Sequence, residues 1–125
     1  DGGLHWTDVS MKELQVHYGF ALCVDPVDPL RAWVIPAISD EIRVAAGRTL
    51  CVCTTEDGGQ YWRVLRKGLP QENCYDIVFR HAFANKAHQM AFGTTTGNLF
   101  CSQDNGEHWQ NLSNYLPRIN CVVFS

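Results

Sequence analysis

Residues 102–109 read Ser-Gln-Asp-Asn-Gly-Glu-His-Trp, and residues 55–62 read Thr-Glu-Asp-Gly-Gly-Gln-Tyr-Trp. Both segments carry the pattern Ser/Thr-x-Asp-x-Gly-x-x-Trp, and residues 1–6, Asp-Gly-Gly-Leu-His-Trp, carry the part of it that begins at the aspartate. Asp-Gly and Asp-Asn-Gly favour tight turns between strands, because glycine accepts a positive φ and aspartate bonds backbone N–H groups of its own turn. The sequence therefore predicts three β-hairpin turns.

The aspartate, glycine and tryptophan of each turn segment are predicted to be structural. The tryptophan follows the turn by a few residues, where its large ring can pack over the hairpin or a neighbouring strand. The residues concerned are Asp1, Gly3 and Trp6 in the first segment, Asp57, Gly59 and Trp62 in the second, and Asp104, Gly106 and Trp109 in the third.

The repeat extends beyond these turns. Trp109 follows Trp62 by 47 residues, and the same offset relates Leu116-Pro117 to Leu69-Pro70 and Cys121 to Cys74. Trp62 follows Trp6 by 56 residues. A period of this length with several short strands in each unit is typical of β-propeller blades. We therefore expect an all-β fold, a β-propeller of four-stranded antiparallel blades, of which residues 1–125 form two full blades and two partial ones.

The strand pattern gives the expected positions within each blade. The first full blade is predicted at 19–24, 32–35, 50–54 and 61–65, and the second at 75–79, 88–92, 98–102 and 108–112. Residues 5–9 are expected to close a preceding blade, and residues 120–124 to open a following one. A closed ring uses about four to eight blades, so this set is expected to belong to a larger ring or to complete one by self-association.

Composition excludes several kinds of partner. The net charge is -3, and lysine and arginine are scattered singly, so nucleic acid is not an expected partner. No apolar run approaches the roughly 18 residues of a membrane span. The six cysteines include no C-x-x-C pair, and neither a metal nor another cofactor is expected. Cysteines within apolar stretches favour buried thiols in a reducing cytoplasm, and secretion with disulfides stays open.

The three turn segments resemble the Asp boxes, or BNR repeats, of sialidases, xyloglucan-processing glycosidases, sortilin-type receptors and photosystem II assembly factors. Residues 61–70 and 92–99 are also similar to bacterial BNR-repeat proteins labelled glycosyl hydrolases. In those proteins such segments lie toward the C-terminus, which implies that residues 1–125 are the later part of a longer ring. The sialidase pattern includes an arginine triad, and none is identified in this sequence.

Candidate site residues follow from propeller topology. The turns between second and third strands share one face with the connections between blades, and the Asp-box turns lie on the other face. The first full blade carries extra residues at 36–48, which should project from the face that carries the turns between second and third strands. Catalysis of glycoside hydrolysis requires two carboxylates about 5–10 Å apart, or a tyrosine with a carboxylate partner. The candidates are Asp40, Glu41, Tyr75 and Asp76 for catalysis, and Arg43 and Trp33 for binding.

Each candidate also has a structural interpretation. Asp40, Glu41 and Arg43 together are typical of a solvated surface cluster, and Asp76 is typical of a residue that caps a turn. We interpret Arg80 and His81, which follow a predicted inner strand, as structural. Two functions therefore stay open: a noncatalytic propeller that binds a glycan or a protein, and a sialidase-like or xyloglucanase-like glycoside hydrolase with catalytic residues partly in blades outside this chain.

Overall fold

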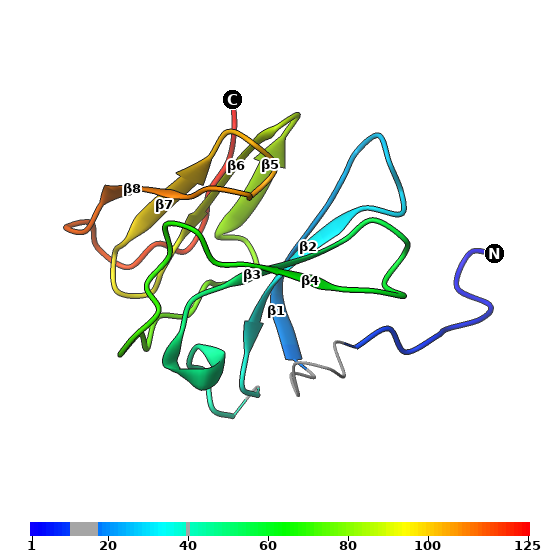
Figure 1. The fold of residues 1–125 in the computed structure, drawn as a ribbon, viewed down its shortest axis with the longest axis horizontal. Coiled ribbons are helices and arrows are strands. Elements are labelled where there is room, and N and C mark those ends of the chain that lie inside the picture. Colours follow the sequence, from blue (N-terminus) through cyan, green and yellow to red (C-terminus); the bar gives the residue numbers. More distant parts are fainter. Residues whose placement is uncertain (11–17, 40) are drawn as a thin grey trace.

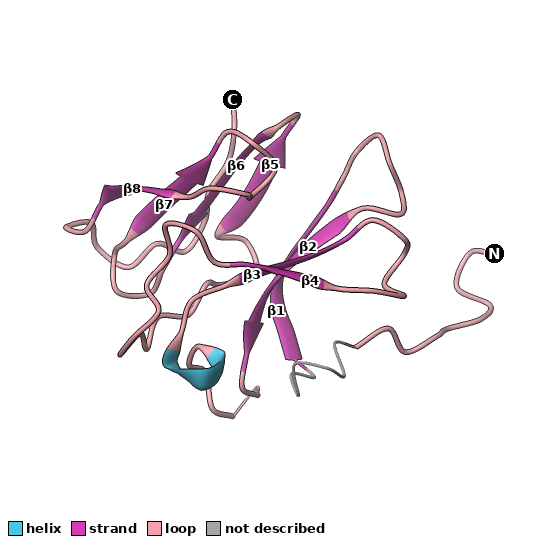
Figure 2. Ribbon diagram, in the orientation of Figure 1, coloured by secondary structure: helices cyan, strands magenta, loops and turns pink. Residues whose placement is uncertain are grey.

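The computed structural model describes residues 1–10, 18–39 and 41–125, and it confirms the predicted all-β class (Figures 1 and 2). Eight strands form two antiparallel four-stranded sheets, in each of which every strand pairs with its neighbour in the chain. The first sheet contains β1 (Tyr18–Val24), β2 (Ala32–Ala37), β3 (Val52–Thr55) and β4 (Arg63–Leu65). The second contains β5 (Phe83–Lys86), β6 (Gln89–Gly93), β7 (Leu99–Ser102) and β8 (Gln110–Ser113).

Seven of the ten predicted strands are confirmed within a few residues, and three are wrong. The first strand of the second sheet is β5, whereas the prediction placed it at 75–79. The apolar run at 77–79 packs into the core without pairing as a strand, and Ile77 and Val78 are buried. The chain then turns, and the Ala82 N–H donates to the Phe79 carbonyl over 2.8 Å. Residues 5–9 and 120–124 contain no strand.

The two sheets contact each other through different faces. We call the face that carries a sheet's own box tryptophan the Trp face, and the other the reverse face. The Trp face of the first sheet carries Val34, Cys53 and Val64 with Trp62, which form a small cluster of their own. Its reverse face carries Ala21, Cys23, Trp33, Ile35, Val52 and Leu65. The Trp face of the second sheet carries Phe83, Met90, Phe92, Phe100 and Trp109.

The main core forms where the reverse face of the first sheet meets the Trp face of the second. The Trp109 ring lies 4.7 Å from the Phe92 ring, centroid to centroid, and 6.5 Å from that of Phe83. The sheets also contact each other along β1 and β5. Because unlike faces meet, one Trp face and one reverse face are turned away from this contact, so the stack can continue in both directions.

The loops differ between the sheets in two places. The β2–β3 loop covers 38–51 in the first sheet, including a short 3₁₀ turn at Ala46–Arg48, against 94–98 in the second. This confirms extra length within the predicted 36–48 region. The β1–β2 loop is also longer, at 25–31 against 87–88 in the second sheet, which the sequence did not predict.

The cysteines follow the prediction of buried thiols only in part. All six are free; Cys101 is half-buried and Cys121 is exposed, while the other four are buried. Burial raises the pKa of Cys23 to about 12. Among residues 1–10, 18–39 and 41–125, no helix has the length and apolar character that a membrane crossing requires.

Candidate functional site

A hollow of about 570 Å³ opens beside the start of β1. Four segments of the chain line it: the beginning of β1, the β2–β3 loop, the turn that precedes β5, and the C-terminal segment. The residues that line it are Tyr18, Phe20, Arg43, Phe79, Arg80, His81 and Asn120.

The local structure of β1 orients the aromatic wall of the hollow. The register of β1 against β2 shifts between Gly19 and Ala21, as in a β-bulge, and such a shift re-aims the side chain beside it. Gly19 permits this close packing, because a Cβ there would lie 2.7 Å from Cγ1 of Val34. Phe20 therefore leaves the alternating pattern of the strand and reaches the hollow.

Three aromatic rings form a continuous surface. The Tyr18 and Phe20 rings are stacked, with centroids 5.7 Å apart and an interplanar angle of 22°. Phe79 meets Phe20 edge-on, with centroids 6.1 Å apart and an angle of 73°. Stacked and edge-to-face pairs are the preferred aromatic arrangements, so each ring holds its neighbour in place. Rings held in this way give the hollow an ordered apolar wall.

Positive charge surrounds these rings. Cζ of Arg43 lies 5.6 Å from the centroid of the Phe20 ring, and Cζ of Arg118 lies 5.8 Å from that of Phe79. Both distances are within the range of cation–π attraction. Arg80 and His81 also line the hollow and are exposed. The hollow therefore combines aromatic and basic side chains.

The structure divides the predicted binding residues. Arg43 lines the hollow. Trp33 is only 1% exposed, lies between the two sheets, and donates from Nε1 to the Asn105 carbonyl over 3.0 Å. This placement makes Trp33 a packing residue that ties the sheets together.

The predicted catalytic residues that the structure describes have different surroundings. Asp40 lies outside the described residues, and Glu41 is exposed in the β2–β3 loop. Asp76 is buried, and its Oδ1 accepts from the Thr96 hydroxyl over 2.6 Å while its Oδ2 accepts from Asn98 Nδ2 over 2.8 Å. These bonds anchor the β6–β7 turn, which is the turn-capping role that the sequence offered as an alternative.

Tyr75 lies beside Asp76 in the chain but has different surroundings. Its side chain is 53% exposed, and Cζ of Arg48 lies 6.0 Å from the ring centroid. Neither Tyr75 nor Asp76 lines the hollow. Tyr75 is therefore an exposed candidate, whereas the Asp76 carboxylate is engaged with the β6–β7 turn.

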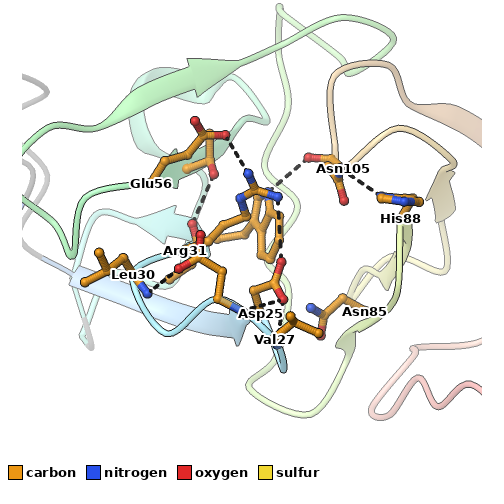
Figure 3. Close-up of polar contacts among 12 residues, drawn as sticks. Asp25, Val27, Leu30, Arg31, Glu56, Asn85, His88 and Asn105 are labelled. Carbon is orange, nitrogen blue, oxygen red and sulfur yellow. Dashed lines mark hydrogen bonds and ion pairs between the residues drawn. The ribbon is translucent and has the colours of Figure 1, made fainter.

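A second polar cluster joins the sheets at the Asp-box turns (Figure 3). Arg31 contacts Asp25 over 3.7 Å and Glu56 over 3.4 Å. Across from them, the Asn105 amide lies 3.2 Å from Nδ1 of His88. N–H donation from Val27 and Asp28 lowers the pKa of Asp25, and the positive charges of Arg31 and His88 add to this effect. Nε of Arg31 is buried without a hydrogen-bond partner among the described residues. Two bonds link the sheets beside the cluster, from Trp33 Nε1 to the Asn105 carbonyl and from Asn85 Nδ2 to the Val24 carbonyl, so we assign the cluster to cohesion of the sheets.

Sequence reasoning missed most of the hollow. It interpreted Arg80 and His81 as structural, and it did not select Tyr18, Phe20, Phe79, Arg118 or Asn120. A signal was present in the predicted first strands of the two blades, at 19–24 and 75–79. Each has a phenylalanine near one end, Phe20 and Phe79, and Arg80 follows Phe79 directly. That the two phenylalanines meet depends on the packing of the sheets, which the sequence did not specify.

Other chemistry receives no support from the part of the chain that is described. No group of three or more His, Cys, Asp or Glu side chains there is arranged to hold a metal ion. A search of protein-family models found no match to the chain, and a search of curated proteins found none either.

Proposed function

We propose that this chain contributes two blades to an Asp-box propeller that binds an anionic glycan in the hollow beside β1. The observation that carries the proposal is the hollow itself, in which Tyr18, Phe20 and Phe79 form an aromatic surface and Arg43 and Arg80 supply charge. Sugar rings have an apolar face that packs on aromatic side chains, and arginine binds carboxylates through paired N–H groups. A sugar that carries a carboxylate uses both features.

Three features of the fold favour blades over a two-layer sandwich. Each sheet is a simple meander, whereas most sandwiches contain Greek-key crossovers. The sheets pack through unlike faces of the repeat, as successive blades must. β1 and β5, the first strand of each sheet, are in contact, as expected of strands close to a common axis. The resemblance of the turn segments to Asp boxes points in the same direction.

The binding proposal is tested by titrating the chain with glucuronate, N-acetylneuraminate and, as a neutral comparison, glucose, followed by NMR. We expect the acidic sugars to shift the resonances of Phe20 and Phe79, and glucose to shift them far less. Arg43→Ala should weaken acidic-sugar binding about tenfold, because one charge-assisted bond contributes about 1.5 kcal/mol.

Arg48→Ala is the matched control, since Arg48 is also an exposed arginine above an aromatic ring but lies outside the hollow. It should leave the affinity unchanged. Equal binding of glucose and the acidic sugars, or equal losses in the two variants, would contradict the proposal.

Hydrolysis is the second candidate function, favoured by the resemblance and by the proximity of Tyr75 to Asp76 in the chain. The engagement of Asp76 with Thr96 and Asn98 disfavours it. Release of 4-methylumbelliferone from its glucuronide or sialoside by the chain, abolished by Asp76→Asn at unchanged stability, would establish it.

A further inference from the structure

Cys51 and Cys53 lie side by side on the Trp face of the first sheet. The buried side chains of residues 50–53 alternate between the two apolar clusters. Leu50 and Val52 belong to the core between the sheets, while Cys51 and Cys53 belong to the small cluster on the Trp face. An extended segment produces this alternation, because its successive side chains point to opposite sides of the sheet. The two thiols therefore share one face and are separated along the chain by a single residue.

The two thiols contact each other directly. A hydrogen bond between them lowers the pKa of Cys51, while the same contact and burial raise the pKa of Cys53. Cys51 is 5% exposed and Cys53 is fully buried. Val34 lies in the same cluster, and Trp62 packs against it. Two neighbouring sulfur atoms are therefore enclosed by mainly apolar side chains.

The geometry of a strand disfavours a disulfide between these cysteines. Residues two apart on an extended strand have Cα atoms about 6.6 Å apart, with Cβ atoms that point the same way. A disulfide requires Cβ atoms about 3.5–4.5 Å apart, so its formation would bend the strand. An ion in line between two sulfurs holds them about 4.6 Å apart, because metal–sulfur bonds are about 2.3 Å long. The spacing of the pair therefore suits a bridging ion better than a disulfide.

The number and type of ligands select the ion. Structural zinc sites use four protein ligands and favour C-x-x-C pairs, whereas this pair is C-x-C. In the part of the chain that the structure describes, no group of three or more His, Cys, Asp or Glu side chains is arranged for a metal. Thiolates are soft ligands that favour Cu(I), and Cu(I) accepts two ligands in a line. A pair of thiols is therefore sufficient for Cu(I) but not for zinc.

A fixed arginine supplies the charge that such a complex requires. The antiparallel register of β3 and β4, continued by one residue, places Arg66 opposite Cys51. Nη1 of Arg66 donates to Thr49 Oγ1 over 3.0 Å and to Gln71 Oε1 over 3.1 Å. Its positive charge favours the thiolate form of both cysteines. Because Cu(I) with two thiolates carries one negative charge, the guanidinium offsets the charge of the complex.

We propose that Cys51 and Cys53 form a two-coordinate site for Cu(I), in which Arg66 offsets the charge of the bound complex. Binding forms two copper–sulfur bonds and releases the two thiol protons to solvent, without a change in oxidation state. None of these three residues lines the hollow, so the inference is independent of the proposed binding of glycans.

The test titrates the reduced chain with Cu(I) that is buffered by bicinchoninate. Cys101 and Cys121, which are the more exposed thiols, are first replaced with alanine. We expect one Cu(I) to bind per chain and the Nε1–H resonance of Trp62 to shift, because Trp62 packs in the same cluster. The Trp109 resonance, which reports on the second sheet, should not shift. Zn(II) should bind at least a hundredfold more weakly than Cu(I).

Substitutions identify the ligands. Cys51→Ala and Cys53→Ala should each weaken Cu(I) binding at least a hundredfold, because one sulfur remains. Cys23→Ala is the matched control, since Cys23 is a buried thiol on the reverse face of the same sheet, and it should leave the affinity unchanged. Arg66→Gln should weaken binding about tenfold through the loss of its charge, whereas Arg66→Lys should retain most of the affinity.

Circular dichroism of the copper-free variants shows whether each one folds. If an alanine variant does not fold, the Cβ resonances of the cysteines provide the same test in the chain that retains the pair. Those of Cys51 and Cys53 should shift on addition of Cu(I), and that of Cys23 should not. Failure to take Cu(I) from bicinchoninate, equally strong binding of zinc, or equal losses in Cys23→Ala and Cys51→Ala would overturn the proposal. A disulfide between Cys51 and Cys53 in place of the copper complex would also overturn it.

Discussion

The first and third Asp boxes have nearly the same turn and opposite surroundings. In both, the aspartate accepts the N–H of the histidine four residues later and lies within 2.9 Å of its Nδ1. Trp6 is 88% exposed, however, while Trp109 is 3% exposed. The turn is therefore a local property of its residues, whereas the tryptophan stabilises the fold only where a neighbouring sheet covers it.

The largest expected difference concerns the two tryptophans. Trp109→Ala should lower the free energy of unfolding by about 3–5 kcal/mol, because it empties the contact among Phe83, Phe92 and the first sheet. Trp6→Ala should change it by less than about 0.5 kcal/mol, as exposed substitutions do. Urea unfolding followed by circular dichroism measures both.

Trp62 provides an internal check on this comparison, since its ring is only partly buried on the Trp face of the first sheet. Trp62→Ala should fall between the other two variants. Similar losses for Trp6 and Trp109 would mean that the box itself, rather than the cover provided by a neighbouring sheet, carries the stability.

The two boxes also show how far sequence reasoning reaches. The turns were predictable because Asp-x-Gly determines a short-range structure through its own backbone bonds. The strand at 75–79 was not, because a run such as Ile77-Val78-Phe79 is equally apolar whether it pairs in a sheet or packs without pairing. The apolar pattern of this run indicates that its side chains are buried. Whether its backbone pairs as a strand depends on long-range packing.

The same division applies to the candidate site. Arg43 was selected because it lies in a loop with extra residues, and it does line the hollow. Phe20 reaches the hollow through a register shift beside Gly19, and Phe79 through a turn before β5. Neither feature has a strong local signature, so the contact between these two rings was not predictable from the sequence.

A smaller difference is expected at the box glycines. Gly3 and Gly106 have φ values of 85° and 88°, so alanine is strained in both turns. A Cβ on Gly106 would lie 3.2 Å from Cδ1 of Leu65 in the first sheet, whereas the atoms nearest to a Cβ on Gly3 belong to its own Trp6. Gly106→Ala should lower the free energy of unfolding by about 1–2 kcal/mol, measured by urea unfolding.

Gly3→Ala should leave global stability unchanged, because its turn can distort without disturbing the sheets. NMR of residues 1–6 would detect that local change. If Gly3→Ala lowered global stability as much as Gly106→Ala, residues 1–10 would have to be part of the cooperative fold.

The smallest expected effect is on the acid stability of the third box. Burial alone would raise the pKa of Asp104, but bonds from His108 and Ser102 outweigh it and lower the pKa to about 2. Since the folded pKa is below the ordinary value of 3.8, the ionised carboxylate stabilises the fold above about pH 4, and this contribution is lost as the pH falls toward 2. Asp104→Asn should therefore reduce stability at pH 6 and flatten its decline between pH 4 and 2. Because the Asp104 side chain is 43% exposed, solvent keeps the effect small.

Asp1→Asn is the control, since it lies in the uncovered first box. It should leave the pH profile of unfolding unchanged. A change that matched that of Asp104→Asn would place the first box inside the cooperative unit and remove the contrast between the two boxes.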